Sequence, residues 1–171
     1  MAPDLEIKQK TITSAQQLAL ETADGKLHVL CVGISDYTTG SGFAKLPVCT
    51  NDAVKVAHCF QDVRELNADK AKIRTLTSKN GSPSKGAIIQ AMHELACGAN
   101  ESDRILFFFS GHGQRLDDDD EFYLVPEDAF RADDRDTLLS FNRVFELLKQ
   151  SEAKQKIVII DACLSGPSDL K

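Results

Sequence analysis

The stretch KIVIIDACLSG, residues 156–166, places an acid and a cysteine directly after a run of branched aliphatic residues. Such a run is typical of a buried β-strand, because branched side chains pack well on a pleated sheet. Asp161 and Cys163 come at the end of the run, whereas a cysteine that only fills space belongs among the aliphatic side chains. The stretch therefore predicts a buried strand that ends in two reactive side chains, followed by a glycine turn.

Strands and helices alternate on the N-terminal side of this stretch. Apolar runs of strand length occur at residues 27–34, 72–77 and 104–110. Patterns of helical periodicity occur at residues 51–63, 82–97 and 141–150. Apolar strands that alternate with helices are typical of a parallel sheet covered on both faces. We therefore expect an α/β fold, a three-layer α/β/α sandwich with a mostly parallel sheet.

The expected helix ends follow from capping chemistry. Asn51 or Asp52 is expected to cap the first helix and Ser140 the third, because their side chains accept from the exposed N–H groups of a first turn. The Ser-Pro pair at residues 82–83 is expected to begin the second helix. The acidic segment at residues 117–128 indicates a turn and a short exposed strand.

Length and composition favour one globular domain. The chain has 171 residues, of which 42% are hydrophobic, and one core of this size is ordinary. We expect an N-terminal arm or linker at residues 1–25 and a single domain at residues 26–171. The net charge of −6 argues against a nucleic-acid or anionic membrane partner. No apolar run is long enough to cross a bilayer, and the N-terminus lacks the apolar core of a secretory signal.

The cysteines indicate a reducing compartment. The five are Cys31, Cys49, Cys59, Cys97 and Cys163. Their number is odd and their spacings fit no zinc-binding pattern. We therefore expect free thiols and a cytoplasmic location, with Cys31, Cys59 and Cys97 as packing residues.

Two predicted strands end in side chains that suit covalent catalysis. The segment RILFFFSGHGQ, residues 104–114, contains His112 between two glycines. Cys163 lies just after the last predicted strand. A nucleophilic cysteine needs a base that keeps it as thiolate, and open α/β sheets place chemistry at the carboxyl ends of their strands. We expect the flanking glycines to allow a sharp turn. The backbone N–H groups of Gly113 and Cys163 are candidate donors to an oxyanion.

Four motifs carry a resemblance to a known family. They are VGISDY at 32–37, CTNDA at 49–53, SGHG at 110–113 and DACLSG at 161–166. The 51 residues from the histidine to the cysteine match the caspase spacing of about 50 residues. From residue 27 onward, the chain resembles the caspase-like cysteine peptidases, most closely the large subunit of metacaspases and bacterial orthocaspases.

The resemblance implies a role for each matching residue. Cys163 would be the nucleophile and His112 its general base and acid. Asp161 and Asp52 would be the acids of a substrate pocket, and Ser110 part of its wall. Metacaspases cut proteins after Arg or Lys, so the implied partner is a protein or peptide with a basic residue before the cut. The alternative for Asp52 is a helix cap, and for Asp161 a strand-end residue that binds nearby amides.

Two further residues bear on specificity. Caspases that cut after Asp have Gln at the position of Asp161 and carry an Arg in the loop after the first strand. The nearest base here is Lys45. Two acids in a pocket would repel an acidic substrate and pair with a basic one. Cys49 matches a second family cysteine of minor role.

The sequence implies no required cofactor. Many metacaspases are activated by Ca²⁺, and the run Asp117–Asp120 offers the oxygen ligands that this ion prefers. Its spacing does not match an EF-hand loop, so a solvated turn is favoured. Asp133, Asp134 and Asp136 leave the same two alternatives open.

The resemblance also implies a second segment. The last strand is too apolar for a sheet edge, and caspase-like enzymes complete their sheet with a smaller C-terminal segment released by cleavage. The chain ends GPSDLK at Lys171, a residue that an acidic pocket would select. We therefore expect a zymogen that cuts itself after Lys171. The alternative is that Lys171 is an arbitrary end point.

The sequence is compatible with three functions. The favoured one is an endopeptidase with a Cys–His dyad and an acyl-enzyme intermediate. The second is a silent caspase-like module that only binds partners, against which the intact His112 and Cys163 argue. The third is an effector protease that stays inactive until a partner or a small-molecule signal orders it.

Overall fold

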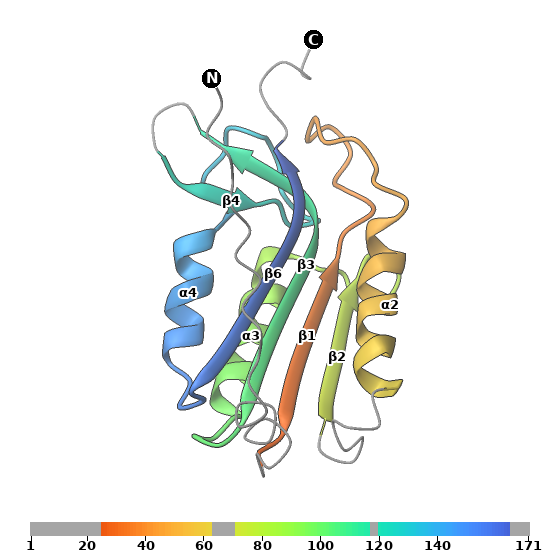
Figure 1. Ribbon diagram of the computed structural model, residues 1–171. Helices are drawn as coiled ribbons and strands as arrows, with labels where there is room; N and C mark the ends of the chain where they lie inside the picture. Colours follow the sequence, from red (N-terminus) through yellow and green to blue (C-terminus); the bar gives the residue numbers. More distant parts are fainter. Residues whose placement is uncertain (1–24, 63–70, 117–119, 165–171) are drawn as a thin grey trace, which may run out of the picture.

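A computed structural model shows one sheet with helices on its two faces (Figure 1). The residues that it describes are 25–62, 71–116 and 120–164. The elements, in chain order, are β1 (Leu27–Gly33), α2 (Cys49–Asp62), β2 (Ala71–Thr77), α3 (Lys85–Cys97), β3 (Arg104–Arg115), β4 (Phe122–Leu124), β5 (Leu139–Ser140), α4 (Phe141–Lys149) and β6 (Gln155–Leu164).

The sheet is mixed. β1 pairs in parallel with β2 and with β3, and β6 pairs in parallel with β3. The short strands β4 and β5 extend the sheet in antiparallel pairing from the end of β3. At the carboxyl edge, Gly33 of β1 is in register with Ser110 of β3, and Ser110 with Asp161 of β6.

Alternating side chains of the central strands build two separate cores. Leu30 and Val32 of β1 join a cluster with buried residues of α3 and α4. Val29 and Cys31 join a second cluster with Ala53 of α2. Because successive strand residues face opposite sides of a sheet, α2 covers one face while α3 and α4 cover the other. The α/β/α sandwich predicted from the sequence is confirmed.

Two helix starts differ from the prediction. α2 begins at Cys49, so Asp52 lies in its first turn instead of capping it, and the backbone N–H of Asp52 already donates to the carbonyl of Val48. α3 begins at Lys85, because the Ser84 side chain accepts from the N–H of Ala87 and thereby caps the helix. The cap by Ser140 is confirmed: its hydroxyl accepts from the N–H of Arg143.

The strand predictions need three corrections. The last strand does not end at Asp161 but runs through Cys163 to Leu164, and its described residues are exposed or half-buried rather than buried. β3 does not end at Ser110 but continues through SGHGQR, because β6 and β4 pair with this extension. β4 was expected to be exposed, but Tyr123 and Leu124 are buried in it. The chain between β4 and α4 covers this strand with Ala129 and Leu138. β5, two residues long, had no signal in the sequence.

The described cysteines are free thiols with different surroundings. Cys31 is fully buried, and burial raises the pKa of its thiol to about 12. It is therefore the packing residue that the sequence predicts. Cys59 and Cys97, however, are exposed. The prediction that these two pack in the core was wrong, because each occupies a solvent-facing position on its helix.

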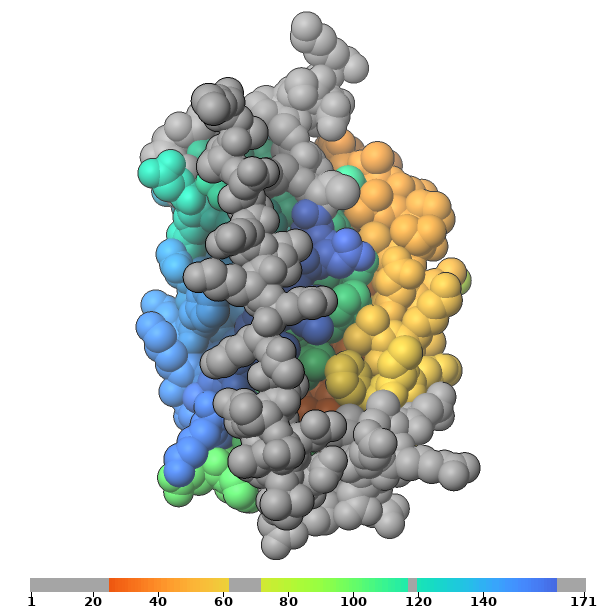
Figure 2. Space-filling model, viewed as in Figure 1, coloured from red at the N-terminus to blue at the C-terminus, as the bar shows by residue number. Residues whose placement is uncertain are grey.

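The outer strand β6 keeps an apolar face at the surface. Its Val158 and Ile160 pack against the core formed with α3 and α4. Ile157 and Ile159 point to the other face and are 47% and 42% exposed. Figure 2 shows atoms of β6 at the surface beside those of α2 and its preceding loop. Among the described residues, β6 pairs with β3 alone.

No helix in residues 25–62, 71–116 or 120–164 is long and apolar enough to span a membrane.

Candidate active site

The last residues of β3 and β6 lie side by side at the carboxyl end of the sheet. In the register of these parallel strands, Ser110 pairs with Asp161 and His112 pairs with Cys163. Neighbouring strands lie about 4.8 Å apart, so the backbone of Cys163 is one strand spacing from that of His112. The structure brings together the histidine and the cysteine singled out from the sequence, with Ser110 and Asp161 two residues before them.

Ser110 and Asp161 are joined by a hydrogen bond. The Ser110 hydroxyl donates to the Oδ2 of Asp161 at 3.4 Å. Ser110 is 1% exposed, whereas Asp161 is exposed. A carboxylate has two acceptor oxygens, so Asp161 can hold this bond and still accept from a cation. Asp161 lies two residues before Cys163 on β6, and Ser110 lies two residues before His112 on β3.

The glycines around His112 serve close packing rather than a turn. The backbone is in extended strand through this segment, so the sharp turn expected there is absent. A Cβ on Gly111 would lie 3.1 Å from the hydroxyl oxygen of Tyr37, and one on Gly113 would lie 2.5 Å from the ring of Phe122. The glycines therefore let two aromatic side chains approach the strand that carries His112.

A backbone carbonyl fixes the orientation of the imidazole. The Nε2 of His112 lies 2.8 Å from the carbonyl oxygen of Ala44. Because a carbonyl oxygen only accepts, Nε2 carries the hydrogen in this contact. In the neutral ring, Nδ1 is then the basic nitrogen. This is the arrangement that a general base requires, with one nitrogen holding the ring and the other taking protons.

Two aromatic rings flank the imidazole. The ring centroids of Tyr37 and Phe43 lie 4.9 Å and 5.5 Å from that of His112. The hydroxyl of Tyr37 accepts from the backbone N–H of His112 at 2.9 Å. Sequence reasoning placed Tyr37 only within a family motif and missed Phe43 and Ala44, which no local pattern marks.

The first turn of α2 approaches the same edge of the sheet. A Cβ on Gly33 would lie 2.4 Å from the carbonyl oxygen of Cys49 and 2.7 Å from the Cβ of Ala53. The helix therefore contacts β1 directly at Gly33, which is in register with Ser110. Asp52 lies in this first turn. It thus stands at the same end of the sheet as the candidate site.

Lys45 is already paired with an acid. Its Nζ lies 2.8 Å from the Oδ1 of Asp36, and both side chains are well exposed. The hydrogen bond to Asp36 raises the pKa of Lys45 above its usual value.

The described residues of the acidic segments form no grouped metal site. Arg131 holds Asp133 through an ion pair of 2.6 Å, and Asp120 is exposed. In the part of the chain that the structure describes, no three His, Cys, Asp or Glu side chains are grouped to bind a metal. Asp117 to Asp119, the turn at Gly166 and Lys171 lie outside the described residues.

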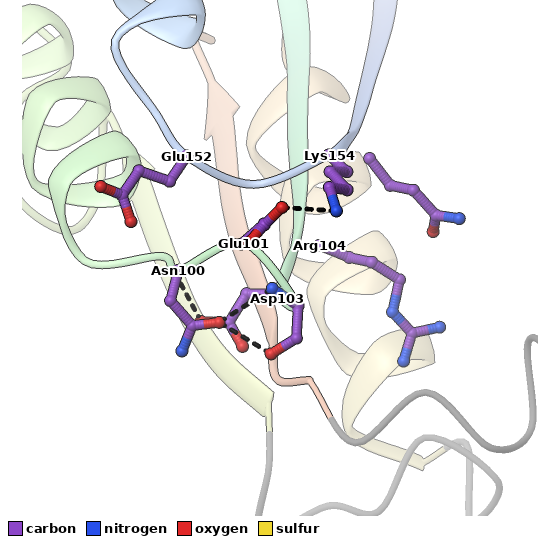
Figure 3. Close-up of a pocket in the computed structure, with 8 residues that line it drawn as sticks. Asn100, Glu101, Asp103, Arg104, Glu152 and Lys154 are labelled. Carbon is purple, nitrogen blue, oxygen red and sulfur yellow. Dashed lines mark hydrogen bonds and ion pairs between the residues drawn. The ribbon is translucent and has the colours of Figure 1, made fainter.

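A cavity lies at the opposite end of the sheet. It has a volume of about 690 Å³ and lies where β3 and β6 begin. Figure 3 shows it lined by charged and polar side chains, with Lys154 paired to Glu101 at 2.5 Å. It contains neither cysteine nor histidine. The cavity therefore does not compete with the carboxyl edge as a site for covalent chemistry.

Comparison with known proteins agrees with this geometry. The family model of the caspase domain matches residues 26–170. The chain belongs to the caspase domain family. This family of cysteine peptidases is the one that the four sequence motifs indicate, so the resemblance is confirmed.

Relatives of the caspase domain here include fungal metacaspases. Metacaspase-1 of Cryptococcus neoformans var. neoformans serotype D, from strains JEC21 and B-3501A, is 32% identical over 96 residues. The matched region covers 55% of this chain and 20% of each metacaspase. The chain thus spans about one fifth of the length of the curated relatives it matches.

A solved structure shares the caspase-like fold. The crystal structure of a protein from Geobacter sulfurreducens is similar with a TM-score of 0.65 and 20% sequence identity. The similarity covers 84% of this chain and 52% of that chain. At this identity the likeness concerns the fold alone.

Proposed function

We propose that this chain carries the catalytic part of a cysteine endopeptidase, with Cys163 as nucleophile and His112 as general base and acid. One observation carries the proposal: the two residues are in register on neighbouring parallel strands of a caspase domain. Their backbones are therefore one strand spacing apart, which is the basis for proposing that they act together.

The contacts of the imidazole support the direction of proton transfer. Ala44 accepts from Nε2, which leaves Nδ1 to take the proton of the Cys163 thiol. The resulting thiolate attacks the carbonyl carbon of the peptide bond and forms a tetrahedral oxyanion. Backbone N–H groups of Gly113 and Cys163 are the proposed donors to that oxyanion.

The remaining steps return the enzyme to its starting state. The C–N bond breaks as the imidazolium of His112 protonates the leaving amine, and an acyl thioester remains on Cys163. Water then attacks the thioester while His112 takes a proton from it. The acid product leaves, the thiol is restored and the imidazole is neutral again.

The substrate proposal is a protein or peptide with Arg or Lys before the cut. Asp161 presents a carboxylate beside His112, anchored by the buried hydroxyl of Ser110. Asp52 lies in the first turn of α2 at the same end of the sheet. Acids in these positions pair with a guanidinium or an ammonium group.

We further propose that a C-terminal segment completes the sheet beside β6. The support is the apolar face of this outer strand, where Ile157 and Ile159 are about half exposed. Residues 26–171 would then be the large-subunit part of the peptidase domain, preceded by an arm at residues 1–25. Cleavage after Lys171 in a zymogen would separate the two segments.

A reducing, cytoplasmic location fits the thiols. The four cysteines whose side chains are described are all free, and a nucleophilic thiol must stay reduced to act. Mapping the redox state of each cysteine in protein isolated under alkylating conditions tests this location.

A peptide library tests the proposed function. The chain, expressed alone and in a longer form that includes any C-terminal segment, should cut after Arg or Lys in at least one form, and Cys163→Ala should abolish cutting without unfolding the protein. Losing a nucleophile costs on the order of 10³-fold or more. Assays with and without Ca²⁺ show whether the ion is needed. Substantial cleavage by Cys163→Ala would end the assignment.

A further inference from the structure

Tyr37 holds His112 at two points. Its hydroxyl accepts from the backbone N–H of His112 at 2.9 Å and donates to the carbonyl oxygen of Ile34 at 3.4 Å. Its ring lies against the imidazole, with centroids 4.9 Å apart and planes inclined by 44°. One side chain therefore fixes both the strand position and the ring of His112.

Phe43 contacts the imidazole from the loop between β1 and α2. Its ring centroid lies 5.5 Å from that of His112 and 5.7 Å from that of Tyr37. The next residue, Ala44, supplies the carbonyl that accepts from Nε2. The three rings are in mutual contact, so a change in the orientation of the imidazole requires the other two to move.

The loop that carries these residues is tied to the rest of the fold. The N–H of Leu46 donates to the carbonyl of Ser35 at 2.9 Å, which closes the loop at its base. The N–H of Thr38 donates to the carbonyl of Glu127 at 3.0 Å, which joins the loop to the segment after β4. The aromatic side chains are thus presented from a fixed backbone.

We propose that Tyr37 and Phe43 are positioning residues, which hold the His112 imidazole in the one orientation that leaves Nδ1 as the basic nitrogen. The proposal rests on the proposed function of His112 as general base. A base acts only within hydrogen-bond reach of its proton, and a misplacement of about 1 Å costs on the order of 10²-fold in rate. Tyr37 acts through its hydroxyl and its ring, Phe43 through its ring alone.

The chemistry of Tyr37 is consistent with this task. Burial raises the pKa of its phenol well above the usual range. The hydroxyl therefore stays protonated over the working range of a peptidase. It can accept from His112 and donate to Ile34 at the same time.

The variants separate the two contacts. Tyr37→Phe keeps the ring and removes the hydroxyl, Phe43→Leu removes one ring, and Tyr37→Leu removes both the hydroxyl and a ring. We expect kcat to fall about 10-fold for each of the first two and about 100-fold for Tyr37→Leu, approaching the loss of a general base. KM should stay within about 2-fold, because substrate contacts are unchanged.

The matched control is the second tyrosine of the chain. Tyr123 is 2% exposed, and Tyr37 and Phe43 pack against the cluster to which it belongs. Tyr123→Phe removes a buried hydroxyl of the same kind and should leave kcat near the wild-type value. An equal fall of kcat in Tyr123→Phe and Tyr37→Phe would mean general loosening of the cluster, and would overturn the positioning role.

Nuclear magnetic resonance of the imidazole nitrogens tests the proposal without any turnover. The chain has 4 histidines, and His112→Ala identifies the signals of His112. At pH 8.5, where an ordinary imidazole is neutral, the wild type should show a single tautomer with hydrogen on Nε2. Tyr37→Leu should show a mixture of tautomers, while the other three histidines are unchanged.

The kinetic and the resonance measurements distinguish failure of the positioning role from failure of the proposed peptidase function. A fixed Nε2–H tautomer in the wild type that Tyr37→Leu turns into a mixture supports positioning even if the protein cuts no peptide, and then only the proposed function fails. The same single tautomer in the wild type and in Tyr37→Leu overturns the positioning role even if the protein is an active peptidase.

Discussion

At the scale of single residues, the proposed preference for a basic residue before the cut depends on Asp161 and Asp52. Asp161→Ala and Asp52→Ala should each lower kcat/KM for a peptide with Arg before the cut by at least about 10-fold, because the guanidinium loses its partner. Their reaction with iodoacetamide, a small uncharged thiol reagent, should change little.

The control for this prediction is an acid at the other end of the sheet. Glu152→Gln removes a charge beside the large cavity and should leave both rates unchanged. Faster cleavage after Asp than after Arg by the wild type would contradict the acidic pocket and favour Lys45 as the contact.

Gly113 is required by the ring of Phe122. Gly113→Ala would place a Cβ 2.5 Å from that ring, and overpacking of this kind typically costs about 1–3 kcal/mol of stability. Gly86→Ala is the matched control: a Cβ there meets nothing within 4 Å, so stability should rise by about 0.4–1 kcal/mol. Urea unfolding measures both. Equal stability of Gly113→Ala and wild type would show that the ring moves aside freely.

The candidate residues differ in how far the sequence could predict them. His112 and Cys163 could be found because each ends an apolar run and their separation matches a known spacing. Phe43 and Ala44 could not, because their role depends on a loop that closes through Leu46 and Ser35, far from His112 in sequence. The glycines beside His112 were recognised as necessary, but the reason is the approach of two aromatic rings and not a turn.

At the scale of elements, Asp103 ties the start of β1 to the turn before β3. Its carboxylate accepts from the backbone N–H groups of Lys26 at 2.7 Å and Asn100 at 3.0 Å, and it lies 3.0 Å from the Nε2 of His28. Burial alone would raise the pKa of Asp103, but the hydrogen bonds from Asn100, Lys26 and His28 hold it below its usual value.

This carboxylate makes the stability of the sheet depend on pH. Because the pKa is lower in the folded state, the contribution is fully present above the unfolded-state value of about 3.9 and is lost as pH falls through the folded-state value. Asp103→Asn should cost about 2 kcal/mol at pH 7, and its stability should fall less steeply than that of the wild type below pH 4. Parallel pH curves for the two proteins would contradict this assignment.

The elements themselves were largely predictable. The long apolar strands and α4 follow from periodicity and from the Ser140 cap, since local chemistry and tertiary packing agree there. The extension of β3 through SGHGQR could not be predicted, because glycines weaken a strand and only pairing with β4 and β6 keeps it extended. β5 exists only because β4 lies beside it.

At the scale of the whole molecule, the proposed self-processing after Lys171 can be tested in a longer chain. In a longer chain, a fragment that ends at Lys171 should form when Cys163 is intact and not in Cys163→Ala, because the enzyme would cut its own basic residue. Intact-mass spectrometry of the two proteins measures this. The same fragment from both would mean that another protease makes the cut, and its absence from both would exclude self-processing at Lys171.

The most direct test of the central claim is covalent labelling with a peptide acyloxymethyl ketone that ends in Arg. A thiolate at position 163 beside His112 should be alkylated first, and peptide mapping should find the label on Cys163. The exposed thiols Cys59 and Cys97 serve as internal controls and should react far more slowly. His112→Ala should slow the labelling by about 100-fold. Labelling of Cys59 or Cys97 as fast as Cys163, or labelling that does not depend on His112, would contradict the account.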